Sequence, residues 1–509
     1  MKKTLALLLI CTMLLAGCAP AAAPEAGAAE ASAAEAVRTD LVVGNTGEPD
    51  TLNIFQAGGK AINLFVLKNI LEPLYTYDAD KQLVAVLAEG YESSDDLMEY
   101  TVKIKQGVKF QNGEELKASD VVFSVQKSAE GGYMDEFTGL IASTEAVDDY
   151  TVKFTLVNPA VLFIENMAQY LYIVSEKEYT ERGDDAIALD PSGIGTGAYQ
   201  FDSWESGVAV KLTAFDGYHG AAPAIKDITI KFIAEASSGV IALETGDVDI
   251  YTAPTFLDAD NLSKNPEIQV CNKQGETVYY LVMHTQQPPF NDVNVRKAIF
   301  HAINRQDICV ADYNTVGATP TGTLTIPGSF AYVDTSLSIE QDLELAKEYM
   351  AKSAYPDGFD CVLTFNNTII ADVLKDQLAK IGINMEIDLM DFSAMVDVLM
   401  SEDQMQMNIM NSSSMRDAGQ QLYDKVISTA WINFSKYNNP TVDALLNEYI
   451  LTKDEARRKA IVAEVQQILD DEMPFVPMIV PNQVMAADAD LKNFTFNNGT
   501  DIDFKSLSW

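Results

Sequence analysis

The side chains that most often carry out catalysis are few in this sequence and stand in no catalytic motif. Histidine occurs only at His219, His284 and His301, and none of them belongs to the H-E-x-x-H pattern that places two zinc ligands on one helix face. The sequence has neither a G-x-S-x-G nucleophile turn nor an EF-hand loop. Catalytic signatures are therefore absent, and the sequence gives no reason to expect an enzyme, a metal or another cofactor.

A glycine-rich segment, with Gly193, Gly195 and Gly197 at alternate positions, could be taken for a phosphate-binding loop. Such a loop ends in Gly-Lys-Ser or Gly-Lys-Thr, whose backbone N–H groups and ammonium hold the phosphates. Here the segment 199–204 follows instead, and its alternation of apolar and polar residues indicates a strand. The glycines predict a turn before a strand and no nucleotide site.

The charge of the chain limits its partners. The sequence has 74 Asp and Glu against 35 Lys and Arg, a formal net charge of -39. Nucleic-acid phosphates would be repelled, so no nucleic-acid partner is expected. A cationic or zwitterionic ligand is compatible with this balance, although an acidic surface by itself indicates only solubility.

The N-terminus has the pattern of an export signal. Lys2 and Lys3 precede the apolar run 5–15, which is too short for a membrane-spanning helix of roughly 20 residues. The run ends in Leu-Ala-Gly-Cys, which resembles the lipobox of bacterial lipoproteins, in which the Cys is acylated and the preceding segment removed. The resemblance implies a signal peptide at 1–17 and lipidation of Cys18, which anchors the protein at the outer face of the cytoplasmic membrane. Secretion after ordinary cleavage is the alternative.

The segment that follows predicts a tether and then a folded body. Residues 18–36 are mostly Ala, Glu, Pro, Gly and Ser. These side chains bury too little apolar surface to offset the conformational entropy that the segment would lose on folding. Patterned sequence starts near Val37, and no later apolar run approaches spanning length. Cys271, Cys309 and Cys361 are odd in number and widely spaced, so neither a disulfide framework nor a zinc site is indicated.

Several motifs then stand in a fixed order along the chain. The longest covers residues 87–114 and contains Tyr-Thr-Val-Lys-Ile-Lys-Gln-Gly-Val-Lys-Phe at 100–110. The others are Glu-Pro-Leu at 72–74, Gly-Thr-Gly-Ala-Tyr at 195–199, Pro-Pro-Phe-Asn-Asp-Val-Asn-Val-Arg-Lys-Ala-Ile at 288–299 and Pro-Phe-Val-Pro at 474–477. Together they resemble family 5 of the bacterial extracellular solute-binding proteins, the peptide- and nickel-type binding proteins of ABC importers.

The resemblance implies a fold and a division of the chain. The fold is α/β, of the periplasmic-binding-protein type II (cluster C) class, with two lobes and an additional inserted domain. The expected parts are lobe I (37–76, 191–275 and 474–509), the inserted domain (77–190) and lobe II (276–473). Local patterns place the elements within these parts, with a strand at 100–105, a turn at Asn112-Gly113, a helix after Asp120, and helices over 442–450 and 453–469.

The resemblance also implies a function. The chain is expected to be the substrate-binding component of an ABC importer, a monomer that captures a peptide or similar small solute outside the membrane and delivers it to the permease and its ATPase. Other solutes, such as a nickel chelate or an oligosaccharide, remain open. A ligand sensor or a chaperone-like extracytoplasmic protein is the alternative class.

Three residues are predicted to line the cleft and to select the charged end of the ligand: Asp417, Arg416 and Trp431. In peptide-binding members an Asp in a short acidic segment of the second lobe pairs with the α-ammonium of the peptide, and the corresponding segment here is 412–419. The family commonly has two Asp in this segment, the second followed by Pro. Asp417 is followed by Ala and matches the second, so this sequence departs from the pattern of an ordinary peptide binder.

Arg416 and Trp431 each have a second interpretation. The fork of Arg416 can receive a carboxylate in a bidentate manner, or it can pair with the neighbouring Asp417. The ring of Trp431 can stack on a ligand, or it can be a core side chain.

Overall fold

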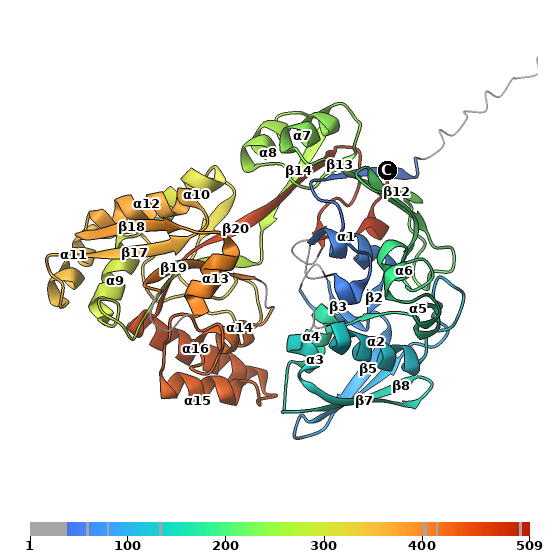
Figure 1. The fold of residues 1–509 in the computed structure, drawn as a ribbon, viewed down its shortest axis with the longest axis horizontal. Helices are drawn as coiled ribbons and strands as arrows, with labels where there is room; N and C mark the ends of the chain where they lie inside the picture. Colours follow the sequence, from blue (N-terminus) through green and yellow to red (C-terminus); the bar gives the residue numbers. More distant parts are fainter. Residues whose placement is uncertain are drawn as a thin grey trace, which may run out of the picture. The chain divides into compact units, whose positions relative to one another are not determined.

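The computed structural model describes residues 38–57, 61–78, 81–131, 135–400, 405–413, 416–497 and 501–509 (Figure 1). Residues Arg38–Trp509 cluster as one unit. The predicted signal peptide, Cys18 and the tether lie outside the described residues. Within the described ranges, no helix has both the length and the apolar character needed to cross a membrane.

A sheet of 12 strands forms the framework, in the order β10-β11-β12-β1-β13-β20-β15-β19-β17-β18, with β14 and β16 also paired to β20. Its strands are β1 (Asp40–Asn45), β10 (Tyr199–Glu205), β11 (Ala209–Ala214), β12 (Asp227–Phe232), β13 (Ile250–Tyr251), β14 (Ile268–Gln274), β15 (Thr277–Met283), β16 (Ala318–Pro320), β17 (Phe359–Phe365), β18 (Ile383–Leu389), β19 (Met407–Ser413) and β20 (Phe475–Asp488).

The long strand β20 belongs to both halves of this sheet. Its first part pairs with β15 and β16 of lobe II, and its second part pairs with β13 and β14 of lobe I (Figure 1). Phe475 and Ile479 accordingly lie in the core of lobe II, whereas Met485 and Ala487 lie in the core of lobe I. The predicted division of the chain stays a prediction. The pairing shows in addition that residues 475–481, predicted as part of lobe I, pair with strands of lobe II.

The helices that accompany the sheet follow its two halves. In lobe I they are α1 (Ala61–Ile70), α7 (Ala236–Glu244) and α8 (Phe256–Leu262), with the short helices η1 (Ile54–Gln56) and η2 (Phe504–Ser506) and the hairpin β21 (Phe496–Asn497) and β22 (Asp501–Ile502). The helices α5 (Glu176–Arg182) and α6 (Asp184–Leu189) fall in the range predicted for the inserted domain, but their Tyr179 and Ile187 lie in the core of lobe I. In lobe II they are α9 (Val293–Ala302), α10 (Arg305–Tyr313), α11 (Leu343–Lys352), α12 (Thr368–Ala379), α13 (Phe392–Met400), α14 (Ala418–Val426), α15 (Pro440–Tyr449) and α16 (Glu455–Glu472).

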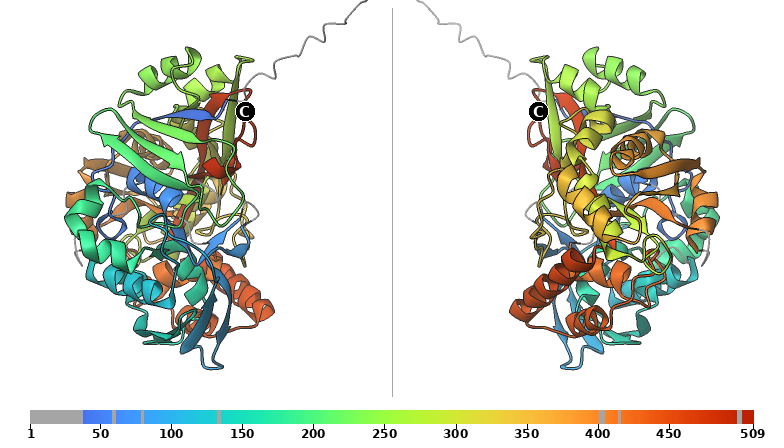
Figure 2. Two further views of the ribbon diagram at one scale, coloured as in Figure 1. Left: turned by 90° about the vertical axis from the view of Figure 1, so that its right-hand side faces the viewer. Right: turned by 90° about the vertical axis from the view of Figure 1, so that its left-hand side faces the viewer.

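The inserted domain has its own sheet and its own core. Strands β5 (Ala88–Ser93), β6 (Glu99–Ile104), β8 (Thr151–Leu156) and β7 (Ile141–Asp148) pair in that order, and α2 (Ala118–Gly131) packs against β7 and β8 (Figures 1 and 2). The remaining elements are β4 (Leu83–Ala85), α3 (Asp135–Thr138), α4 (Phe163–Tyr170) and β9 (Tyr172–Ile173). The strands β2 (Glu72–Pro73) and β3 (Tyr75–Tyr77) lie at the predicted end of the first lobe I segment, and β2 pairs with β9. One buried cluster runs from Leu74 to Ile173, so this region packs around its own apolar side chains.

The elements expected from sequence periodicity are confirmed. The strand at 100–105 is β6, the helix after Asp120 is α2, and the two C-terminal helices are α15 and α16. The glycine-rich segment is a close packing site, because a Cβ atom on Gly195 would lie 1.9 Å from the carbonyl oxygen of Ile70. Only glycine fits against the end of α1 there.

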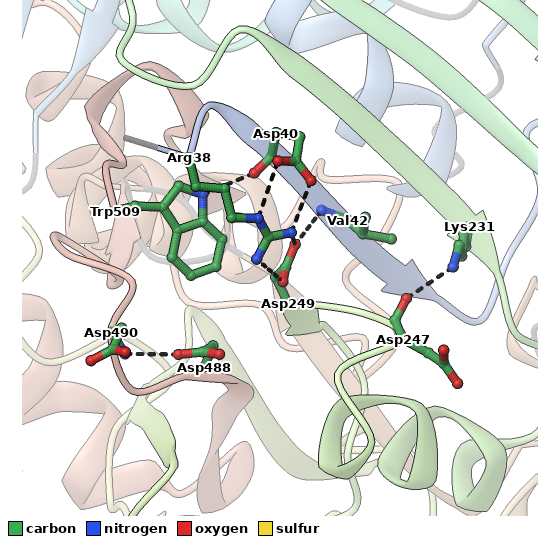
Figure 3. A network of polar contacts seen from close by, with 9 residues as sticks. All are labelled: Arg38, Asp40, Val42, Lys231, Asp247, Asp249, Asp488, Asp490 and Trp509. Carbon is green, nitrogen blue, oxygen red and sulfur yellow. Dashed lines mark hydrogen bonds and ion pairs between the residues drawn. The ribbon is translucent and has the colours of Figure 1, made fainter. Parts of the chain in front are cut away.

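Arg38 ties the start of the described chain to its end and to the middle of lobe I (Figure 3). Its guanidinium donates to both oxygens of Asp249, at 2.7 and 2.8 Å, and to both oxygens of Asp40. It also lies 4.2 Å from the ring centroid of Trp509, whose Nε1 donates to the carbonyl of Asp40. Asp249 additionally accepts from the backbone N–H of Val42, so one buried carboxylate orients β1 beside β13.

Arg38→Ala should destabilise the protein by roughly 1–3 kcal/mol, because it leaves the buried Asp249 carboxylate without its cation. A suitable control is Arg457→Ala. Arg457 is exposed to a similar extent and also pairs with two carboxylates, but those of Glu448 and Glu464 are in water. The free energy of unfolding in urea should change little in this control, because exposed ion pairs contribute little to stability. Equal losses in the two variants would contradict the assigned role of Asp249.

Candidate functional site

A cavity of about 330 Å³ is lined by residues of lobe I, the inserted domain and lobe II. Small-molecule sites commonly occupy roughly 300–1,000 Å³, so this cavity suits a short ligand. Phe65, Tyr77 and Tyr172 supply aromatic surface. The charged side chains of the wall are of both signs: Lys68, Glu72, Glu276, Arg416, Asp501, Asp503 and Lys505.

The wall of lobe I is built from α1, the start of β2 and the C-terminal segment. Lys68, in the last turn of α1, forms an ion pair with Asp501 of β22. Glu72 is only 5% exposed, and its carboxylate accepts from Thr196 Oγ1 at 2.9 Å and from the hydroxyl of Tyr218 at 3.0 Å. The His219 Nε2 atom lies 2.7 Å from the same carboxylate. These contacts fix the orientation of Glu72 at the cavity.

Asp503 follows β22 directly and stands before η2. Burial raises the pKa of its carboxyl, the negative charge of Glu72 adds to this, and Lys505 opposes it through its ammonium and its backbone N–H. Two carboxylates are therefore close enough in this wall to repel each other. A positive charge placed beside them would be stabilised.

The wall of lobe II is brought together by one pair of strands. β15 pairs antiparallel with β19 so that Thr277 lies opposite Ser413, which puts the residues before β15 and after β19 at the same edge of the sheet. Glu276 and Arg416 leave the sheet there, with Arg416 Nη2 3.4 Å from Glu276 Oε2. The guanidinium of Arg416 lies 4.4 Å from the ring centroid of Tyr77 in β3, and Lys81 Nζ lies 3.6 Å from Glu276 Oε1.

The backbone beside Arg416 is fixed by Phe330. The N–H of Phe330 donates to the carbonyl of Arg416 at 2.8 Å, and the N–H of Ala418 donates to the carbonyl of Phe330 at 2.9 Å. The side chain of Arg416 is 13% exposed. Arg416 lines the cavity. Its contact with a ligand stays a prediction.

Asp417 is absent from the cavity wall and acts as the N-cap of α14. Its carboxylate accepts from the backbone N–H of Gln420 at 2.8 Å, from the hydroxyl of Tyr449 at 2.5 Å and from Arg458. The residue is 7% exposed, and burial raises the pKa of its carboxyl, against the opposing effects of Arg458 and Tyr449. Contact with a ligand ammonium would require Asp417 to give up one of these donors, and it stays a prediction.

Gly419 permits this arrangement. A Cβ atom at Gly419 would lie 2.1 Å from the ring of Tyr449. The absence of a side chain there lets the Tyr449 ring pass close to the helix start and reach Asp417.

Trp431 lies between α14 and α15 and is not part of the cavity wall. Its side chain is 65% exposed, so the alternative of a core Trp is wrong. Contact between this ring and a ligand stays a prediction.

Sequence reasoning missed most of the cavity wall. Glu72 stands in one of the family motifs, which could have marked it, but Lys68, Glu276, Asp501 and Asp503 stand in no motif that points to a ligand. They meet only because distant chain segments fold against one another.

Comparison with known proteins identifies the family. The family model described as bacterial extracellular solute-binding proteins, family 5, matches residues 82–433, more than half of the chain. The chain belongs to this family. The resemblance inferred from the motifs is thus confirmed, and with it the role of a solute-binding protein.

Whole-chain similarities agree with this assignment. The chain is 28% identical to the glutathione-binding protein GsiB of Escherichia coli K12, over 97% of this chain and 96% of that protein. It is similar to the periplasmic binding protein DppA of Helicobacter pylori in complex with the peptide STSA, with 25% identity, a TM-score of 0.75, and 92% and 98% of the two chains covered. The ABC transporter substrate-binding protein CtaP of Listeria monocytogenes has the same fold, with 23% identity, a TM-score of 0.82, and 93% and 99% covered. The expected type II two-lobed α/β fold is confirmed.

A half-buried acid, Glu165, stands where the inserted domain meets lobe II. Glu165 of α4 has its pKa raised to about 7, mainly by burial and further by Asp417, against the effects of a backbone hydrogen bond and of Arg458. Burial, and after it the charge of Glu165, raises the pKa values of Tyr77, Tyr91 and Tyr100. Next to this acid, the N–H of Val161 donates to the carbonyl of Ile450, which joins the two parts by a backbone hydrogen bond.

The raised pKa predicts a loss of stability with rising pH. Between the ordinary value of 4.5 and about 7, the folded protein keeps a proton on Glu165 that the unfolded chain has lost. The free energy of unfolding therefore falls through this window, by at most about 1.4 kcal/mol per pH unit. Glu165→Gln keeps the side chain neutral at every pH. Its free energy of unfolding relative to that of the wild type should therefore rise by about 1–2 kcal/mol between pH 5 and pH 8. This value is reduced because the side chain is partly exposed.

Urea unfolding of both proteins at pH 5, 6, 7 and 8 would measure this difference. Glu244→Gln, which changes an exposed acid at the end of α7, is the matched control and should show no such gain. If the free energies of unfolding of the wild type and Glu165→Gln change in parallel with pH, Glu165 is not the cause of the pH dependence.

Proposed function

We propose that this protein is the substrate-binding component of an ABC importer and that it captures a short peptide or a similar small solute in the cavity between its lobes. The observation that carries this proposal is the composition of the cavity wall, in which lobe I and lobe II each contribute charged side chains. A ligand held by both lobes stabilises one arrangement of them relative to the others, and a permease can distinguish that arrangement. No chemical change of the solute is required.

The class of solute is supported by two relatives. GsiB is named as glutathione-binding, and DppA was solved with the peptide STSA. Both ligands are small and carry charged groups that salt-bridging side chains can hold. A peptide-like molecule with free ends therefore fits this cavity, and no observation favours a nickel chelate or an oligosaccharide over it.

Binding without turnover is the direct test of this role. Purified protein should bind glutathione or a short peptide in isothermal titration calorimetry, and mass spectrometry should recover the solute unchanged. Deleting the gene should abolish uptake of that solute, whereas a ligand sensor would leave uptake intact. Conversion of the solute by the pure protein would overturn the proposal.

We further propose that the exposed ring of Trp431 meets the ligand or the segment that closes over it. Binding should then change the intrinsic fluorescence, and Trp431→Phe should remove that change. Trp204→Phe is the control, because Trp204 is engaged in lobe I, where its Nε1 donates to Glu48. A fluorescence change that survives in Trp431→Phe would place the reporting ring elsewhere.

Anchoring to the membrane through Cys18 is part of the same proposal. A tethered binding protein stays near its permease, and two or three acyl chains hold it stably where one chain is marginal. Cys18→Ser should release the protein from the membrane fraction or leave it unprocessed, and mass spectrometry should find acyl chains on the mature wild-type N-terminus. A wild-type N-terminus that is unmodified, or that begins at another residue, would contradict the anchor.

A further inference from the structure

The inserted domain and lobe II also meet outside the cavity wall. The N–H of Val161, just before α4, donates to the carbonyl of Ile450 at the end of α15, at 3.1 Å. Lys453, in the loop between α15 and α16, donates through Nζ to the carbonyl of Ser94 at 2.8 Å. The side chain of Leu162 is 4% exposed and belongs to the buried cluster of lobe II. We call these five residues the α4 contact.

One face of α4 connects the α4 contact with the cavity. Side chains three, four or seven positions apart lie on the same face of a helix. Leu162, which is the N-cap of α4, has this spacing to Glu165 and to Gln169. Leu162 packs in lobe II, whereas Gln169 is exposed and lines the cavity. Glu165 therefore stands between a contact of two lobes and the wall of the proposed binding site.

The inserted domain surrounds Glu165 with tyrosine hydroxyls. Tyr77 of β3, Tyr91 of β5 and Tyr100 of β6 all interact with its charge. Burial raises the pKa of each of these tyrosines above its ordinary value of 10, so they are neutral at physiological pH. These three neighbours bring no positive charge that would stabilise the carboxylate.

Lobe II presents an ion pair to Glu165. Asp417, at the start of α14, opposes the ionisation of Glu165, and Arg458 of α16 favours it. The two are paired with each other, and the hydroxyl of Tyr449 donates to Asp417, so their effects on Glu165 largely offset each other. The nearby guanidinium of Arg416 lies over the ring of Tyr77.

Burial is thus the main influence on Glu165, and it raises the pKa of this carboxyl to about 7. Separation of the lobes would expose the shared face of α4 to water and bring this pKa back toward its ordinary value of 4.5. Formation of the contact therefore takes up a proton between these two values, and the contact weakens as the pH rises through them.

We propose that the α4 contact is a pH-sensitive latch between the inserted domain and lobe II, which forms when Glu165 carries a proton and favours the arrangement of the lobes that encloses the solute. This inference rests on the proposed function and adds to it a dependence of solute capture on pH. A solute that binds the enclosed arrangement then binds more tightly at lower pH, because acid and solute favour the same arrangement.

Small-angle X-ray scattering of the purified protein without solute tests the latch itself. The radius of gyration of the wild type should be larger at pH 8 than at pH 5.5. Glu165→Gln stays neutral and should keep the smaller value at both pH values. Glu244→Gln, which changes an exposed acid of α7, should behave as the wild type does. Equal radii of the wild type at the two pH values would overturn the latch.

A second variant tests the contact without changing a charge. Leu162→Ala removes apolar surface from the α4 contact and should show the larger radius at both pH values. Its unfolding curve in urea reports whether the variant is folded under the conditions of the scattering measurement. A folded Leu162→Ala protein with the radius of Glu165→Gln would contradict the role of this contact.

Calorimetry with glutathione tests the effect on binding. The ratio of the wild-type Kd to the Kd of Glu165→Gln should rise roughly three- to tenfold from pH 5.5 to pH 8. Titration of glutathione and of the cavity groups affects both proteins, so this ratio isolates Glu165. A ratio that stays constant or falls would overturn the pH-sensitive latch while the importer role stands. If neither protein binds glutathione, the proposed function fails for this solute, and the scattering still decides on the latch.

Discussion

The pairing of β20 with both halves of the main sheet is the constraint on which the rest of the structure depends. This strand is 14 residues long, and its backbone hydrogen bonds extend from β15 and β16 to β13 and β14. The backbone of a single strand therefore connects the two halves of the sheet. It also sets β15 beside its second neighbour β19, and the ends of these two strands hold Glu276 and Arg416. The lobe II wall of the cavity is thus a consequence of sheet register.

The segment 416–419 shows how one short sequence divides its work between packing and binding. Asp417 turns inward, caps α14 and meets Arg458 and Tyr449, while Arg416 turns to the cavity and to Tyr77. Breaking a buried ion pair by removing one partner costs about 3–5 kcal/mol, so the inward contacts hold the local backbone firmly. The backbone of Arg416, next to Asp417, is held by the same contacts. A preorganised cation loses less entropy when it binds a carboxylate.

The acidity of the chain and the charge of its cavity are separate matters. The net charge of -39 is spread over the sequence, whereas the cavity has a nearly balanced wall to which each lobe contributes charged side chains of both signs. Charges that face each other across a partly desolvated space interact more strongly than charges on an open surface. Selection of a ligand therefore depends on the local arrangement of a few side chains. The overall charge contributes mainly to solubility.

The sequence by itself determined the family, the fold class and the local elements. Ordered motifs identified the solute-binding family, and period-two and helical patterns located β6, α2, α15 and α16, because these features depend on residues close together in the chain. It also predicted Arg416 as a ligand-binding residue, and this stays a prediction. The tertiary structure alone decided that Arg416 faces the cavity while Asp417 beside it is buried, since adjacent side chains can take opposite directions. Asp503 could not have been found from the sequence, because it lines the same cavity as Glu72 and Arg416 only through the folding of segments far apart in the chain, and no local pattern records such contacts.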